Sequence, residues 1–406
     1  MHNTRYKIKR FDRVLLIVIA LLLGVLSFFR LHAGLMNKLD EATESSGNTY
    51  FFFIVFICLL VYAFTHKTKQ STIGFWILVS YFILSYLFYV PFSLNGLVDL
   101  PIILFWTFCY WFGRRLSVTN KETISYFTRV ILLFAILPLS AYCLFLFFTT
   151  DLVLYQHASD AFFYISAYFP FVLLIGKNRT LKVLIISLFT IIIVISFKRS
   201  IILGFAICLV VYLLNTEYKK YLSKWYMWLI IIAAIITGYY IIHDFIGSIV
   251  ERFSELESDQ GSGRTIIYSH VLSGLSKSDF FHLIFGHGFK SVKTITMGNE
   301  MAHNDILELL YDFGIIGAVI YFLFILSLFK NAIRHRKDKL KKPLYAAFFS
   351  SLTFFVIISL SNCVIYSSMI ISPFMLAFGI YMGLLQARDN KSLASNRILD
   401  HSNEVY

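Results

Sequence analysis

Long apolar runs, separated by short polar segments, follow one another along the whole chain. A helix needs roughly 20 apolar residues to cross the hydrocarbon core of a bilayer. Twelve runs approach that length, at about 14–31, 49–64, 73–90, 98–112, 130–148, 162–175, 183–197, 200–214, 226–246, 306–329, 344–363 and 365–385. The pattern predicts an all-α, polytopic integral membrane protein with about 12 transmembrane helices, folded as a single transmembrane domain over residues 1–406.

Composition supports this class and excludes soluble ones. The chain is 58% hydrophobic and 15% charged, whereas soluble domains are about 45–50% apolar and about 25% charged. Phenylalanine and tyrosine are abundant, with 43 and 25 copies, and we expect most of these rings to face lipid or the membrane interface. The five cysteines all fall inside apolar runs, so neither a disulfide framework nor a thiolate metal site is indicated.

The distribution of positive charge indicates a topology. With the basic N-terminus inside and the spans alternating, 27 of the 36 lysines and arginines fall on the inner side. This asymmetry is the positive-inside pattern of a membrane protein, so the net charge of +13 is not a nucleic-acid footprint. We expect the first run to be an uncleaved anchor, both termini to be cytoplasmic, and residues 386–406 to form a polar cytoplasmic tail.

One segment between the predicted spans is much longer than the others. Residues 247–305 separate the ninth and tenth spans on the outer side, and a connection of this length is usually functional. The segment contains Gly261-Ser262-Gly263, an amphipathic stretch at 265–275, and Phe285-Gly286-His287-Gly288. We predict one or two short helices along the membrane surface here, and we expect the chemistry to take place on this outer face.

Two cations lie at an unexpected place between the seventh and eighth predicted spans. Lys198 and Arg199 fall at the tip of an outer hairpin that has no other polar stretch. Ionisable groups near membrane depth are costly and often functional. The alternative is that both side chains only reach the lipid phosphates, and the pattern does not decide between these readings.

Residues 302–317 predict a helix with acidic groups near its beginning. Asn304 or Asp305 can cap the N-terminus. Glu308 and Asp312 share a helix face at a repulsive spacing, so we expect a positive group nearby. The alternative for Asp305 and Glu308 is a simple interaction with the helix dipole.

Taken in their order along the chain, these motifs resemble the signature of the O-antigen ligase and polymerase superfamily, of the Wzy and WaaL type. The matching elements all fall on the outer side, at Lys198-Arg199-Ser200, Ser262-Gly263-Arg264, Phe285-Gly286-His287-Gly288-Phe289, His303-Asn304-x-x-Leu307-Glu308 and Gly314-x-x-Gly317. Two positions depart from the family pattern: Lys198 replaces a Ser or Gly, and Tyr268 replaces a Trp. The resemblance covers roughly residues 183–330 and implies a GT-C-like enzyme of the bacterial inner membrane.

The resemblance also implies the chemistry. The donor would be a glycan on undecaprenyl diphosphate, and the enzyme would move that glycan to a sugar hydroxyl. Arg199 and Arg264 would hold the diphosphate leaving group, with Lys198 as a further charge, because a guanidinium can bind two phosphate oxygens at once. His303 would be the general base. Asn304, Glu308, Gly286, His287 and Gly288 would contact substrate or orient His303.

Three functions remain open at this point. A polymerase of O-antigen, capsule or exopolysaccharide repeat units is favoured, with a ligase that transfers glycan to lipid A-core (in lipopolysaccharide assembly) as the runner-up. A lipid-linked oligosaccharide flippase is the alternative of another class, but a transporter should show internal repeats, which the sequence lacks. Because no His, Asp and Glu cluster has metal-ligand spacing, we expect no metal and no cofactor. The expected partners are the lipid-linked glycans, membrane lipids, and a chain-length regulator and flippase.

Overall fold

The computed structural model is helical throughout the part of the chain that it describes. That part comprises residues 17–19, 24, 73–89, 94–119, 121–149, 164–175, 179–196, 198–216, 264–296, 300–338 and 341–403. It contains no strand, which agrees with the predicted all-α class. The predicted spans at 14–31, 49–64 and 226–246 lie wholly or mostly outside it, as does the segment 247–263.

The helices follow the apolar runs closely in most places. Their bounds are α3 Ile73–Tyr89, α4 Leu94–Thr119, α5 Lys121–Ile131, the π-helical turn η1 Leu132–Ile136, α6 Leu137–Thr149, α9 Phe169–Leu173, α10 Arg179–Ile195, α11 Arg199–Asn215, α15 Arg264–Lys277, α16 Phe280–Phe285, α17 Val292–Ile295, α18 Asp305–Arg334, α19 Lys342–Ser361 and α20 Ser368–Asn403.

Four helices in the described part are long and apolar enough to cross a membrane. They are Ile124–Leu146, Asp305–Arg334, Lys342–Ser361 and Ser368–Gln386, and shorter apolar helices accompany them. At the predicted span 162–175, the described residues contain an apolar helix over Tyr164–Leu173. This short segment is almost entirely buried and packs inside the bundle.

Helix α20 forms the centre of the bundle. Every residue from Ser368 to Leu385 is buried, and α4 packs along its length. The close approach depends on glycine, because a Cβ at Gly379 would lie 2.0 Å from Tyr110 O and one at Gly383 would lie 2.3 Å from Arg114 O. Small residues four positions apart commonly let membrane helices approach in this way.

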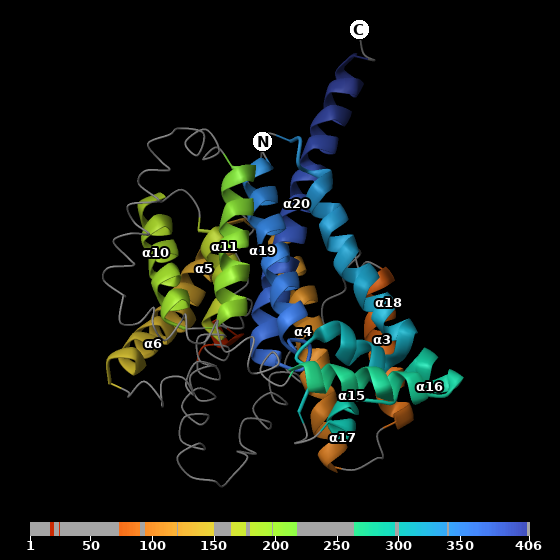
Figure 1. The fold of residues 1–406 in the computed structure, drawn as a ribbon. Helices are drawn as coiled ribbons and strands as arrows, with labels where there is room; N and C mark the ends of the chain where they lie inside the picture. Colours follow the sequence, from red (N-terminus) through yellow and green to blue (C-terminus); the bar gives the residue numbers. More distant parts are fainter. Residues whose placement is uncertain are drawn as a thin grey trace.

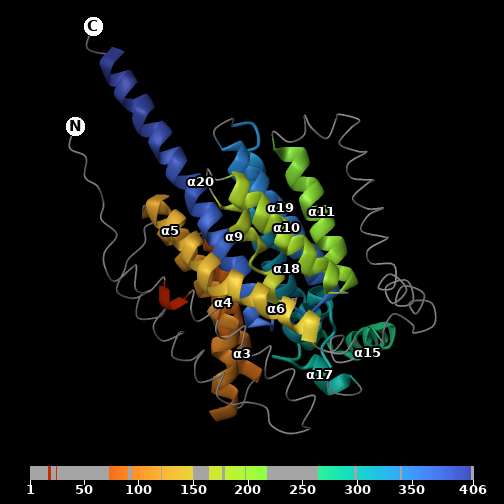
Figure 2. The ribbon, with the colours of Figure 1, turned by 90° about the vertical axis from the view of Figure 1, so that its left-hand side faces the viewer.

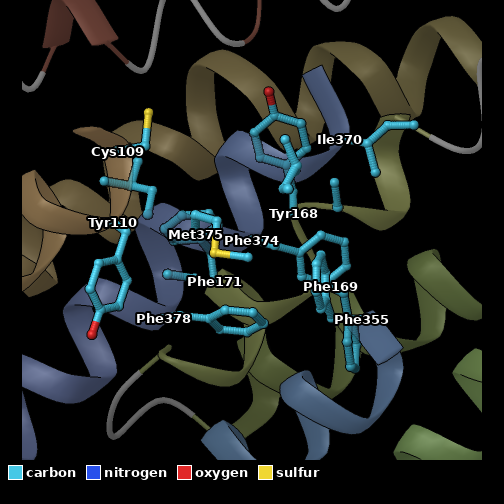
Figure 3. Packing of buried hydrophobic residues seen from close by; sticks show 14 of the residues in the cluster. Cys109, Tyr110, Tyr168, Phe169, Phe171, Phe355, Ile370, Phe374, Met375 and Phe378 are labelled. Atoms are coloured by element: carbon cyan, nitrogen blue, oxygen red, sulfur yellow. The ribbon is translucent and has the colours of Figure 1, made fainter. Parts of the chain in front are cut away.

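Buried aromatic rings surround α20, so among the described residues the expectation that aromatic rings mostly face lipid is wrong. Figure 3 shows rings from α9 and α19 gathered around Phe374 and Phe378 of α20. Phe374 makes edge contacts with Phe354 and Phe355 at 5.8 and 5.3 Å between centroids. The largest fully buried side chains in the described part are all aromatic, so the aromatic residues supply much of the core.

Residues 247–305, predicted to lie on the outer side, are called the outer segment. Their short helices lie at one end of the bundle. In Figure 1, α15 lies across the lower end of the helices, close to α16 and α17, and Figure 2 places α15 and α17 at the same end. Three short helices are present where one or two were predicted. At the opposite end, α20 continues through residues 386–403, so most of the predicted polar tail is helical.

Helix α18 has a break at Gly314 on which the docking of the outer segment depends. Gly314 has φ 65° and ψ −175° inside an otherwise helical run. A Cβ at this position would lie 2.3 Å from Ile284 O, at the end of α16. A residue with a side chain would therefore suffer both an unfavourable backbone conformation and a backbone collision.

Gly314→Ala should destabilise the protein by more than about 2 kcal/mol, through strain and the displacement of α16. A clear fall in the thermal unfolding midpoint in lipid nanodiscs is the expected result. Gly74→Ala on α3 is the matched control, since nothing lies within 4 Å of its added Cβ and alanine favours a helix. Equal midpoints for the two variants would contradict this role of Gly314.

Candidate functional site

The N-terminus of α18 is capped by Asn304, one of the two residues predicted for this role. Asn304 Oδ1 accepts hydrogen bonds from Ile306 N at 2.9 Å and Leu307 N at 3.3 Å. Its Nδ2 donates to Leu360 O at 3.0 Å, at the end of α19. The amide is thus fully engaged with the backbone, and it joins the beginning of α18 to the end of α19.

His303 lies in a tight turn immediately before this cap. Its φ of 50° is in the left-handed region, and its imidazole is partly exposed. On the preceding side, Ala302 N donates to Glu308 Oε2 at 2.6 Å. The backbone of His303 is therefore held from both sides, by Glu308 through Ala302 and by the Asn304 cap.

Glu308 is fully buried and has only one of its oxygens satisfied. Glu308 Oε1 has no hydrogen-bond partner within the described residues. Lys293 of α17 provides a favourable electrostatic interaction with this carboxylate. The two residues form no ion pair in the described part of the chain, so a cation in contact with the acidic face stays a prediction.

Asp305 makes tertiary hydrogen bonds rather than acting only on the helix dipole. Its buried carboxylate accepts from Val364 N at 2.7 Å and Ile365 N at 3.0 Å, and also from Ser359 Oγ. These donors belong to the end of α19 and the link to α20. Asp305 therefore fixes that link against the first turn of α18.

Asp312 attaches the outer segment to α18. Its buried carboxylate accepts from Lys290 N at 2.9 Å, Ser291 Oγ at 2.8 Å and Val292 N at 3.1 Å. The hydroxyl of Tyr366, between α19 and α20, donates to the same carboxylate. Four N–H and O–H donors thus surround this acid, which explains how a carboxylate can be buried beside Glu308.

The Gly286-His287-Gly288 turn docks against the break in α18. His287 N donates to Tyr311 O and Gly288 N donates to Asp312 O, both at 2.9 Å. Gly286 and Gly288 have φ of 89° and 102°, and a Cβ at Gly286 would lie 2.2 Å from Asp312 O. The glycines therefore permit backbone-to-backbone packing against α18, and their predicted contact with substrate remains a prediction.

The side chain of His287 lies within a stack of rings. It lies between Tyr311, at 4.3 Å between centroids, and His282 of α16, at 4.6 Å. Its Nε2 is 2.7 Å from Ser278 Oγ. His282 Nδ1 lies 2.9 Å from Asp279, which also caps α16. Burial, with a smaller contribution from the charge of His282, lowers the pKa of His287, while Asp279 acts in the opposite direction.

The predicted cations lie at the same end of the bundle as His303. Arg199 begins α11, and Lys198 precedes it in extended conformation. Ser200 Oγ is 3.3 Å from Asn362 Nδ2, just after α19 ends and two residues past the carbonyl that Asn304 contacts. The hydrogen bonds thus bring the beginnings of α11 and α18 to the same end of α19.

Arg264 is the first residue of α15, which lies at this end of the bundle. The buried Val271 of α15 packs in a small cluster with Val292, Ala302 and Tyr311. The helix that Arg264 begins is therefore fixed against the residue that precedes His303. Ser262 and Gly263, the other members of this motif, lie outside the described residues.

An apolar groove lies beside the His303 turn, between α18 and α19. Its volume is about 350 Å³, and it begins at Asp305, Ile306 and Leu360 and continues along α18 as far as Ile325. Almost all of its lining is aliphatic or aromatic. Among the lining residues, Asp305, Ser359 and Tyr321 carry polar groups. A hydrocarbon chain would meet apolar side chains along the rest of this path.

Sequence reasoning missed several roles in this region. Asp312 is an attachment point with Tyr366 as a donor, and Ser359 donates to Asp305. Tyr81 Oη donates to Phe313 O at 2.6 Å, next to the break in α18. The spacing of the acids was visible in the sequence, but their donors lie more than fifty residues away or in an irregular turn. In the described residues, no group of His, Cys, Asp and Glu could hold a metal ion.

The helices and the arrangement of this region define an all-helical membrane protein with a polar site at one end of its bundle. Residues 183–322 match the Wzy_C family, described as O-antigen ligase. The match supports the O-antigen ligase/polymerase superfamily of membrane enzymes, with glycosyltransferase-like activity. It runs from α10 into α18 and includes Arg199, Arg264, His287 and His303. No curated protein matches the chain.

Acid should weaken the ring stack at His287. Because its pKa is lowered in the fold, the folded protein favours the neutral imidazole, and the unfolded chain takes up the proton first. The stability from this group is complete above about pH 6.5, the ordinary histidine pKa, and falls as the pH drops below it. The unfolding midpoint should therefore fall less between pH 7.5 and 5.5 in His287→Gln than in the parent, with His270→Gln on α15 as control. An equal fall in all three proteins would contradict this assignment.

Proposed function

We propose that the protein is a membrane glycosyltransferase that polymerises undecaprenyl-diphosphate-linked oligosaccharide repeat units on the outer face of the cell membrane, for O-antigen, capsule or exopolysaccharide. The observation that carries the proposal is the gathering of family-matched elements at one end of the bundle. Hydrogen bonds join the His303 turn and the beginning of α11 to the same end of α19, and α15, which Arg264 begins, packs through Val271 against Ala302. Both termini would be cytoplasmic.

The leaving group would be held at the N-termini of two helices. A lipid diphosphate carries negative charge that grows as the glycosyl bond breaks, and preorganised cations stabilise such charge. Arg199 begins α11 and Arg264 begins α15. A guanidinium at a helix N-terminus adds its charge to the positive end of the helix dipole. Lys198 would contribute a further charge beside Arg199.

His303 would remove the proton from the acceptor hydroxyl. In the reaction, the acceptor oxygen forms a bond to the anomeric carbon, the bond from that carbon to the phosphate oxygen breaks, and the lipid diphosphate departs. The hydroxyl proton passes to the imidazole of His303. The partly exposed ring and the fixed backbone on both sides favour this role, since general bases must be precisely placed.

Asn304 and Glu308 would act as positioning residues for His303. Both side chains bind backbone groups on either side of that residue, which supports orientation of the histidine over direct contact with the sugar. The apolar groove next to the same turn supports a substrate with a hydrocarbon tail and a polar head. A chain-length regulator and a flippase remain the proposed protein partners.

The runner-up is a ligase that transfers glycan to lipid A-core, since the matched family is described as O-antigen ligase. Such an enzyme would use the same donor site with a different acceptor. A lipid-linked oligosaccharide flippase would need no general base. The fixed turn at His303 therefore favours a glycosyltransferase over a flippase.

Purified protein in nanodiscs, given only a lipid-linked repeat unit, should lengthen it into a ladder of products. A polymerase uses the same molecule as donor and acceptor, whereas a ligase requires lipid A-core. Products would be separated on gels after release of the lipid. A glycan transferred only when lipid A-core is added would establish the ligase, and transport without any new glycosidic bond would establish the flippase.

His303→Ala should insert and fold normally but accumulate unlengthened lipid-linked repeat units, because loss of a general base typically slows a reaction by ~10²–10⁴-fold. The initial rate of ladder formation, at equal protein level, is the measurement. His303→Gln is the informative companion, since glutamine keeps hydrogen bonding without useful basicity. Near-parental rates in His303→Gln would show that the imidazole is not the base.

A further inference from the structure

The short helix α16 carries its apolar side chains on the outside. Phe280, Phe281 and Phe285 are 79%, 49% and 39% exposed, and none of its residues is buried. At helical spacing these three rings and Ile284 occupy one arc of the helix. His282 faces the other way and stacks on His287 at 4.6 Å. A helix in water would place its rings inward and its histidine outward, so α16 has the opposite polarity.

Helix α16 adjoins the outer end of α3. The ring of His282 lies 6.3 Å from that of Tyr89, the last residue of α3. Tyr89 follows Leu84, Leu87 and Phe88, which are all highly exposed apolar residues on the same apolar helix. In a membrane protein, such a face meets lipid tails. The hydroxyl of Tyr81, also on α3, donates to Phe285 O of α16 at 3.4 Å. Helix α16 therefore lies next to the end of a lipid-facing surface.

Helix α18 provides a second connection to that surface. A Cβ at Gly314 would lie 2.3 Å from Ile284 O of α16, so the two backbones touch. The next residue, Ile315, is 44% exposed, and exposed apolar residues continue along α18 at Val319 and Phe322. Helix α16 is therefore bordered on two sides by helices whose outward side chains suit hydrocarbon.

We propose that α16 is a lipid-docking helix, with Phe280, Phe281 and Phe285 inserted among the lipids at the interface of the outer leaflet. Amphipathic helices bind membranes in this way, with the apolar face buried about 5–10 Å into the boundary between headgroups and acyl chains. Asp279 and His282 lie on the polar side, where they hydrogen-bond each other. The partner is the membrane surface itself, and the inference does not depend on the reaction that the protein catalyses.

Lipid docking would help to position the site. Helix α16 leads directly into Gly286-His287-Gly288, whose backbone binds the break in α18. An anchor in the leaflet holds the outer end of this segment, while Asp312 holds the following residues Lys290–Val292. The turn is then fixed from both directions.

A photoreactive residue can identify what covers α16. Phe280→benzoylphenylalanine would be irradiated in nanodiscs of phosphatidylethanolamine and phosphatidylglycerol, and intact-mass spectrometry would read the adducts. Phe88→benzoylphenylalanine on α3, which is as exposed as Phe280, is the positive control. Ser273→benzoylphenylalanine on the exposed side of α15 is the comparison within the outer segment.

The expected result is a mass increase of one phospholipid at positions 280 and 88, with severalfold less lipid adduct at position 273. Cross-linking of position 280 to a second copy of the chain would overturn the proposal in favour of a protein interface. Absence of lipid adduct at 280, with efficient labelling at 88, would overturn it in favour of a solvent-exposed helix. Equal lipid labelling at 280 and 273 would remove any specific role for α16.

Discussion

The break in α18 at Gly314 is the constraint on which the rest of this region depends. Backbone polar groups that are shielded from water must find partners, and a broken helix releases carbonyls of the preceding turn. Tyr311 O, Asp312 O and Phe313 O are taken up by His287 N, Gly288 N and the Tyr81 hydroxyl. The outer segment and α3 therefore complete the hydrogen bonding of α18, and the glycines at 286 and 314 allow the necessary approach.

Buried carboxylates near the start of α18 extend this arrangement to other helices. Asp305 binds the α19–α20 link, Glu308 binds Ala302, and Asp312 binds the segment at 290–292. Each acid accepts at least one backbone N–H group, although Glu308 Oε1 has no hydrogen-bond partner within the described residues. One helical end thus collects three separate parts of the chain, which explains how residues far apart in sequence come to surround one turn.

The sequence predicted the parts of this fold that depend on local pattern. Hydropathy located α10, α11, α18 and α19 within a few residues, and Asn304 was one of two candidate caps because of its position before an apolar helix. The span at 162–175 stays a prediction, because the residues before Tyr164 lie outside the described part. The buried aromatic core and the partners of Asp312 depend on tertiary contacts between distant residues, and no local pattern encodes them.

Neighbouring residues of the family-like motif, His303, Asn304 and Glu308, have different roles. The side chains of Asn304 and Glu308 both bind backbone groups on either side of His303. His303 itself is partly exposed. A left-handed backbone is unfavourable for a residue with a side chain, and it persists only where the surroundings impose it. The cap on one side and the carboxylate on the other impose it here. The conformation of His303 is therefore maintained by its neighbours, which fits a group whose direction matters more than its contribution to stability.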